Sequence, residues 1–145
     1  MGYKSYVGQQ LHVSSGGVVY TGTGKDLRIG LLYRAKTDTW HLPKGTQEVG
    51  EALEATARRE IQEETGLQVV LGTSLGSLDS RMEDGGPKQT HYFLARVTEE
   101  VGRGDGEHDL LRFFTPTETV RLLKHTPTLF EREDSIVARA IALLQ

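Results

Sequence analysis

Hydrophobic positions along this chain first form short extended stretches rather than long helices. The stretches 11–20 and 27–34 are rich in Val, Leu, Ile and Tyr, and the polar run Thr-Gly-Thr-Gly-Lys-Asp separates them. This arrangement predicts two strands joined by a turn. A short extended piece is expected at 40–43.

Later segments alternate in the same way. The sequence predicts one or two strands at 67–80 with breaks at Gly72 and Gly76, a turn at 83–87, a strand at 91–97, a polar loop at 99–109 and a strand at 110–114. A short helix is expected from Pro116 to about 124. A helical apolar pattern runs over 129–144, through Phe130, Ile136, Val137, Ala140, Ile141 and Leu144. Strands interleaved with helices indicate an α/β fold whose mixed sheet is covered on both faces.

The segment 52–65 is the clearest helix in the sequence. It contains no Gly, Pro or Val, and Gly66 follows it, as suits the left-handed position beyond a helix end. At ~100° per residue, Leu53, Ala57 and Ile61 form a stripe that should face the core. On the opposite side, facing water, we expect Glu51, Ala55, Arg58 and Gln62.

Three glutamates of this helix break the local rules for helix stability. Glu60, Glu63 and Glu64 border the apolar stripe and crowd the last turns, where the helix dipole disfavours each anion by roughly 0.3–1 kcal/mol. A solvated acidic face is the simpler alternative, but several violations in one arc are typical of a site. Carboxylates without Cys or clustered His suit Mg²⁺ or Mn²⁺, which use phosphate oxygens to complete their coordination. The arc therefore predicts a metal site that acts on a polyphosphate.

The whole run from Gly45 to Leu67, GTQEVGEALEATARREIQEETGL, fits the pattern Gly-x5-Glu-x7-Arg-Glu-U-x-Glu-Glu-x-Gly-U, where U is a bulky aliphatic residue. In this the chain resembles the Nudix hydrolases. The resemblance implies an α/β/α sandwich with a mixed sheet, formed as a single domain over residues 1–145.

The resemblance also implies roles for the charged residues of this run. Glu60 and Glu64 would be the principal metal ligands, and Glu63 either a further ligand or the base that activates water. Glu63 and Glu64 rank nearly equal as the base, because coupled carboxylates around one cation cannot be separated by spacing. Arg59 would grip one carboxylate bidentately, with Glu51 as the expected partner.

Outside this run, three segments resemble the Nudix subfamily that hydrolyses dinucleoside polyphosphates. WHLPKG at 40–45 resembles W-x-x-P-K-G, PKQTHYFLA at 87–95 resembles P-K-T-x-x-Y followed by a hydrophobic residue and L-A, and EHDLLRF at 107–113 resembles E-H-x-x-x-R-W. By this resemblance Lys44 and Lys88 would neutralise phosphates, and Glu107 would reach the metal site from its loop. Leu111 stands where many members carry a tyrosine, so the adenine platform is expected to differ.

Further candidates for substrate contact are weaker. Arg34 could touch phosphate or base, or be an ordinary surface arginine, and His41 and His91 could line the pocket. Tyr92 and Trp40 could stack on a base, although aromatic residues in strands are usually core residues.

These observations predict a hydrolase that cleaves diadenosine tetraphosphate asymmetrically into ATP and AMP, with water attacking one phosphorus under carboxylate-bound Mg²⁺. Nucleoside triphosphates, including oxidised ones, ADP-ribose and diphosphoinositol polyphosphates are alternative substrates. An alternative of another class is a Nudix-fold ligand sensor without turnover. Such a relative usually lacks one or more acidic residues of the motif, whereas all are present here.

Composition limits the class of protein and the kind of partner. The chain has 145 residues, of which 37% are hydrophobic and 26% charged, and it contains no apolar run near the ~20 residues that a membrane span needs. The absence of Cys excludes disulfides and thiolate chemistry, and together with the lack of a signal-like apolar start it favours a cytoplasmic protein. A net charge of −3 argues against binding of long nucleic acid. The expected partner is a small nucleotide polyphosphate, and the expected oligomeric state is a monomer or homodimer.

Overall fold

A computed structural model describes residues 10–102, 110–125 and 132–145 of the chain. The elements in chain order are β1 (His12–Thr21), the 3-10 helix η2 (Gly24–Asp26), β2 (Arg28–Arg34), β3 (Thr39–His41), β4 (Lys44–Thr46), α1 (Leu53–Thr65), β5 (Leu67–Arg81), β6 (Pro87–Glu100), β7 (Leu110–Phe114), α2 (Pro116–Lys124) and α3 (Glu133–Leu144).

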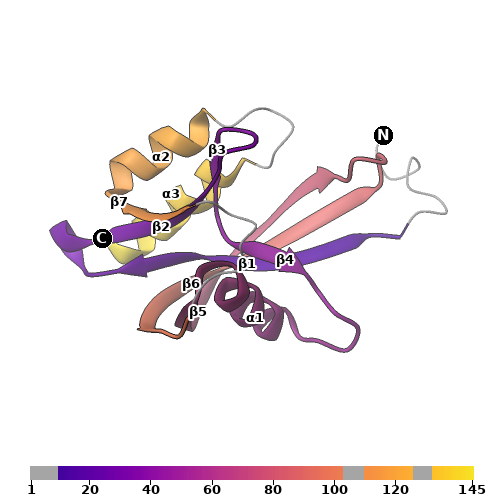
Figure 1. Cartoon of the computed structure of the whole chain (residues 1–145), viewed down its shortest axis with the longest axis horizontal. Coiled ribbons are helices and arrows are strands. Elements are labelled where there is room, and N and C mark those ends of the chain that lie inside the picture. The colour runs from indigo at the N-terminus through magenta and orange to yellow at the C-terminus, as the bar shows by residue number, and fades with distance from the viewer. Residues whose placement is uncertain (1–9, 103–109, 126–131) are drawn as a thin grey trace.

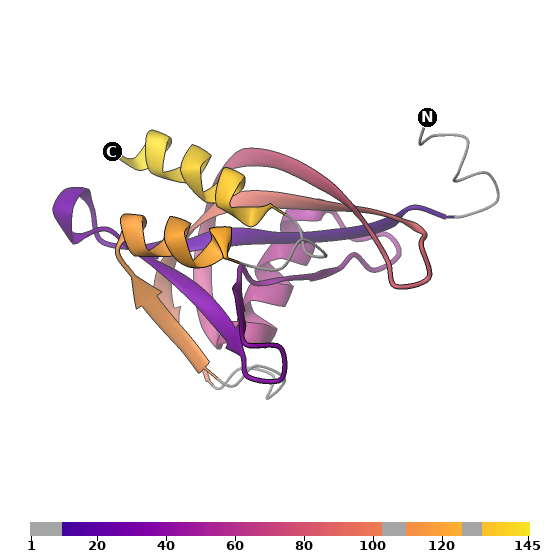
Figure 2. The same ribbon diagram turned by 90° about the horizontal axis from the view of Figure 1, so that it is seen from above.

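The strands form a mixed sheet with the central order β3-β2-β1-β6-β5; β4 pairs with β1, and β7 pairs with β2. Strands β1 and β6 are parallel, whereas the other pairs are antiparallel. Helix α1 lies on one side of the sheet, and α2 and α3 lie on the other (Figures 1 and 2). The expected α/β/α sandwich is confirmed.

Both faces of the sheet are buried, and β1 shows why. Val18 belongs to the cluster that packs under α2 and α3, together with Ile136 and Val137. The next residue, Val19, belongs to the cluster under α1, together with Ile61. Successive side chains of a strand point to opposite faces of the sheet. A strand between two helical layers therefore buries apolar side chains on both faces. Val18 and Val19, two adjacent apolar residues, each pack against a different helical layer.

Several boundaries differ from those expected. Of the piece expected at 40–43, only Trp40 and His41 are strand, at the end of β3; Leu42 and Pro43 lie between β3 and β4. The stretch 67–80 is one strand, β5, that extends to Arg81; the expected breaks are register shifts in its pairing with β6, near Gly72 and Gly76. Strand β6 begins at Pro87 and continues to Glu100, so positions 99 and 100 are strand rather than loop.

The two predicted helical segments beyond β7 are also present. Thr115 caps α2 by accepting a hydrogen bond from the Glu118 amide, while the Glu118 side chain accepts one from the Thr115 amide. Helix α3 begins at Glu133, and positions 129–131 of the predicted pattern lie outside the described residues. Among the described residues, no helix is both long and apolar enough to cross a membrane.

Candidate active site

Strand β4 is the backbone frame of the site, because each of its residues meets a different charged residue of α1. The Lys44 amide donates to Glu64 Oε1 at 2.9 Å. Gly45 lies against the Glu60 carboxylate, so closely that a Cβ there would overlap it. The Thr46 carbonyl accepts from Arg59 Nη2 at 2.9 Å. This short strand therefore aligns the acidic turn of α1 with the sheet.

Arg59 is the centre of an acidic cluster. Its Nε and Nη2 donate to the two oxygens of Glu51 at 2.8 and 2.9 Å, which is the bidentate geometry expected of this pair. Its Nη1 donates to Glu60 Oε2 at 2.6 Å and reaches Glu63 Oε1 at 3.3 Å. Glu48 Oε1 lies 3.4 Å from Nε. One guanidinium thus offsets much of the repulsion among these carboxylates.

Glu51 does not face water as the helical pattern predicted. Helix α1 begins at Leu53, so Glu51 precedes it and the 100° spacing does not apply to it. The loop turns through Gly50, whose φ is 79°, a left-handed value that favours glycine. The Glu51 side chain is only 16% exposed, and its Oε1 also accepts from Thr56 Oγ1 at 2.7 Å.

The electrostatic environment shifts the pKa values of Glu51 and Glu60 in opposite directions. The hydrogen bond from Arg59, followed by those from the Glu48 amide and Thr56, lowers the pKa of Glu51 from 4.5 to about 2. Burial raises the pKa of Glu60, and the nearby charge of Glu63 adds to the rise, although the bond from Arg59 opposes it. The bond to Glu51 raises the pKa of Arg59. Burial therefore disfavours the charged form of Glu60, and a nearby cation would favour it.

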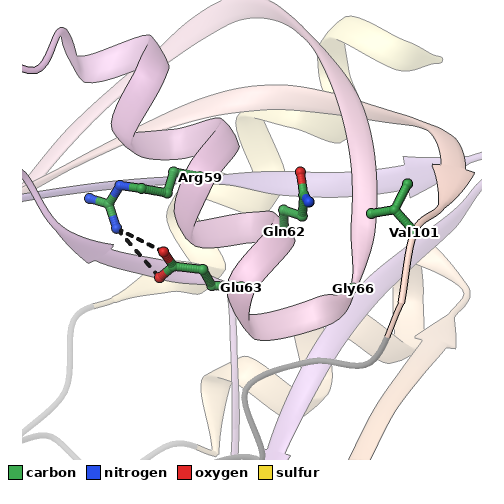
Figure 3. A pocket seen from close by; sticks show the side chains of 5 residues that line it. All are labelled: Arg59, Gln62, Glu63, Gly66 and Val101. Atoms are coloured by element: carbon green, nitrogen blue, oxygen red, sulfur yellow. Dashed lines mark hydrogen bonds and ion pairs between the residues drawn. The ribbon is translucent and has the colours of Figure 1, made fainter.

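Glu63 is the most accessible of the three helix glutamates, with 53% of its side chain exposed against 14% for Glu60. It borders a hollow at the end of α1, and its carboxylate points toward Arg59 (Figure 3). The other residues that line this hollow are Arg59, Gln62, Gly66 and Val101.

Carboxylate oxygens from Glu60, Glu63 and Glu64 are a donor set that fits a hard divalent cation. In the structure the first two are engaged by Arg59 and the third by the Lys44 amide. Within residues 10–102, 110–125 and 132–145, no group of three or more His, Cys, Asp or Glu is arranged as a ready metal site. The ligand types are thus suitable, and Arg59 supplies the positive charge among them. Glu107, the further expected ligand, lies outside the described residues.

The candidate substrate residues divide between the two faces of the sheet. The β1–β4 and β1–β6 registers align Gly45 with His91 through Ser15, and Lys44 with Tyr92 through Gly16. Because side chains alternate along strands, His91 faces the α1 side. Lys44, Tyr92 and Lys88 face the α3 side. His91 Nε2 also lies 2.9 Å from Gln89 Oε1.

Of the aromatic candidates, Tyr92 is a core residue and Trp40 is partly buried against the core. Tyr92 is completely buried, and its hydroxyl donates to Glu133 Oε2 at 2.7 Å, so it offers no face for a base. The rings of Tyr33 and Phe114 flank Trp40, each with its centroid 4.9 Å away. Arg34 ends β2 opposite Thr39, and His41 of β3 lies opposite Leu32.

Glu133 is a residue of this region that the sequence analysis missed. Its carboxylate accepts hydrogen bonds from the Leu42 amide at 2.9 Å and from Lys44 Nζ at 3.1 Å, in addition to Tyr92. The signal was present in the helical pattern. Glu133 is in phase with Ile136, Val137 and Ala140, so it is a charged residue on a buried stripe.

Comparison with known proteins shows the family of the chain. The model of the NUDIX domain matches residues 10–135. The chain is 37% identical over 78 residues to an 8-oxo-(d)GTP phosphatase of Mycolicibacterium smegmatis, a match that covers 54% of this chain and 24% of the relative. A Mycobacterium tuberculosis relative is also 37% identical over 92 residues, which cover 57% of this chain and 37% of the relative. The matched part of the chain therefore spans well under half the length of each of these curated relatives.

Solved structures show the same fold. An Ap4A hydrolase of C. elegans in a binary complex superposes with a TM-score of 0.76 at 20% identity, covering 92% of this chain and 97% of that one. A MutT NUDIX hydrolase from Burkholderia pseudomallei superposes with a TM-score of 0.67 at 24% identity, covering 90% and 98%. At such identities the likeness concerns the fold alone. With the matched domain model spanning most of its length, the chain belongs to the NUDIX family.

Proposed function

We propose that this chain is a divalent-metal-dependent hydrolase of nucleoside polyphosphates, in which water attacks phosphorus and a phosphoanhydride P–O bond breaks. The observation that carries the proposal is the arrangement of Glu60, Glu63 and Glu64 at the end of α1, against the backbone of β4 and beside Arg59. Buried or crowded carboxylates with a partner cation are typical of catalytic sites.

Glu60, Glu63 and Glu64 would hold Mg²⁺ or Mn²⁺. When bound, the ion would neutralise phosphoryl oxygens and lower the pKa of an attacking water. Glu63 and Glu64 are both candidates for the base that removes the proton from that water. Glu63 is the more accessible, whereas Glu64 is tied to the Lys44 amide. Arg59 and Glu51 would hold the acidic turn in position.

A nucleoside triphosphate is the substrate class that we favour over diadenosine tetraphosphate. The relative from M. smegmatis is named for an oxidised guanine nucleotide, and it is similar to this chain in sequence. The Ap4A hydrolase is similar in fold, at 20% identity. Burial of Tyr92 and the packing of Trp40 between aromatic rings leave less stacking surface for the second nucleoside of a dinucleotide. An oxidised guanosine triphosphate is therefore the first substrate to test.

Diadenosine tetraphosphate stays the second candidate, because Lys44 and Lys88 occur in segments that resemble those of dinucleoside polyphosphate hydrolases. A longer phosphate chain needs more cationic contacts, which these lysines would supply.

A substrate panel separates the candidates. Oxidised and ordinary nucleoside triphosphates, diadenosine tetraphosphate, ADP-ribose and a diphosphoinositol compound would be incubated with Mg²⁺ in isotopically labelled water, which identifies the phosphorus attacked. Glu63→Gln and Glu64→Gln should each lower kcat by about a hundredfold or more, by removing a metal ligand or base. Glu54→Gln, an exposed change on the same helix, is the matched control.

Two outcomes would contradict the proposal. Nucleotide binding without hydrolysis by the unmodified chain would favour the sensor alternative. Hydrolysis that is unaffected by chelation or by both glutamine variants would exclude these carboxylates as the catalytic site.

A further inference from the structure

Glu133 lies at the start of α3, yet it contacts Lys44 of β4, the strand that frames the site. Only 5% of its side chain is exposed. Its Oε1 accepts from the Leu42 amide at 2.9 Å, and its Oε2 lies 3.1 Å from Lys44 Nζ. A buried carboxylate needs such donors, because desolvation of an unpaired charge is costly.

Lys44 is consequently fixed at two points. Glu133 holds its ammonium group on the α3 face of the sheet, while Glu64 accepts from its amide on the α1 side. Only 17% of the Lys44 side chain is exposed. The next residue of β4, Gly45, lies against Glu60. A single short strand thus connects the carboxylate of α3 to two carboxylates of α1.

We infer that Glu133 is a positioning residue for the hydrolysis, acting through Lys44. This inference rests on the proposed function. An unrestrained lysine has four rotatable bonds and would sample many positions for its charge. The ion pair with Glu133 restricts Nζ to one position beside β4, so that its charge is available at a fixed place when a phosphate chain enters. Tyr92 stabilises the same carboxylate through its hydroxyl.

A purely structural role for Glu133 is the competing explanation, and a double-mutant cycle distinguishes the two. Glu133→Gln keeps an acceptor for the Leu42 amide but removes the charge that holds Lys44. Lys44→Gln keeps a donor for Glu133 but removes the ammonium group, and is preferable to a methionine, which would leave the buried carboxylate without this partner. The two single variants and the double variant would be assayed with the best substrate of the panel.

If Glu133 acts through Lys44, Glu133→Gln lowers kcat about tenfold and leaves KM within about threefold, because a released ammonium group still attracts phosphate. In the Lys44→Gln background the same change has less than about a twofold effect. An equal loss in both backgrounds would overturn the inference, as would a higher KM with unchanged kcat. Thr115→Ala is the stability control: it removes the α2 cap, so it should lower Tm and leave kcat and KM unchanged.

A second measurement does not depend on turnover. Calorimetric titration with a methylene-bridged nucleoside triphosphate reports ligand binding by the same variants. If the unmodified chain hydrolyses nothing, the proposed function fails, and the inference is then judged on binding alone. It survives if Lys44→Gln raises the Kd while Glu133→Gln leaves it within about threefold, and falls if Glu133→Gln raises the Kd as much as Lys44→Gln does.

Discussion

The carboxylate of Glu60 lies directly against the backbone of Gly45, in space that any side chain at position 45 would fill. No positive φ is involved, so the requirement for glycine is steric rather than conformational. The glycine that opens the sequence motif is thereby explained by a contact with a glutamate fifteen residues later in the chain.

Gly45→Ala should therefore displace Glu60 from β4. We expect a fall of at least about a hundredfold in kcat/KM, because displacement of a metal ligand by an ångström removes productive geometry. Affinity for Mn²⁺, followed by electron paramagnetic resonance, should fall in parallel. Gly72→Ala is the matched control, since a Cβ there makes only an ordinary 3.5 Å contact with Leu94. Retention of full Mn²⁺ affinity by Gly45→Ala would contradict the steric explanation.

Arg59→Lys should damage the site although it preserves the charge. Lysine cannot form the paired bonds to Glu51 while also reaching Glu60 and the Thr46 carbonyl. We expect kcat to fall by about ten- to a hundredfold, with some metal binding retained, since a positioning contact is lost rather than a ligand. Glu51→Gln in the Arg59→Lys background should add little. Steady-state kinetics of Arg59→Lys, Glu51→Gln and the double variant measures the coupling between the two residues. Independent effects on kcat would show that the pair does not act as a unit.

Glu51 and Glu60 should titrate separately in the metal-free protein. Carboxyl carbon NMR should show Glu51 ionised down to about pH 2 and Glu60 taking up a proton above its ordinary 4.5. The stabilisation from Glu51 is complete above pH 4.5 and is lost as the pH falls toward 2. The contribution of Glu60 has the opposite sign: because its folded pKa is raised, stability falls as the pH rises through the range above 4.5. Superimposed titration of both groups near 4.5 would refute this assignment.

Tyr92→Phe should lower the free energy of unfolding while leaving nucleobase preference unchanged. The variant keeps the buried ring and removes only the donor to Glu133, at a cost of about 1–3 kcal/mol. Denaturant unfolding gives the stability, and the ratio of kcat/KM between adenine and guanine nucleotides gives the preference. A changed ratio with unaltered stability would mean that Tyr92 contacts the base after all.

The long β5–β6 pair illustrates where sequence reasoning was incomplete. Gly72 and Gly76 indicated breaks, because glycine commonly ends strands. In the fold they lie where the pairing register shifts, and Gly76 has a φ of 93°. A bulge and a strand end demand the same residue, so the sequence could not distinguish them.

Local patterns in the sequence predicted the α/β architecture and the helix that carries the acidic residues, and they led to the proposed type of site. Each of these follows from local patterns: the apolar stripe of α1, the glycine after it and the glutamates between them. Tertiary packing alone brings Glu133 into contact with Tyr92. The pairing of Arg59 with Glu51 was expected from the family resemblance, whereas the helical spacing had placed Glu51 toward water. Residues that are distant in the chain meet only when the layers pack. The periodicity of α1 also gives no direction for a residue that lies outside that helix. No spacing along the sequence encodes which buried charge will face which strand.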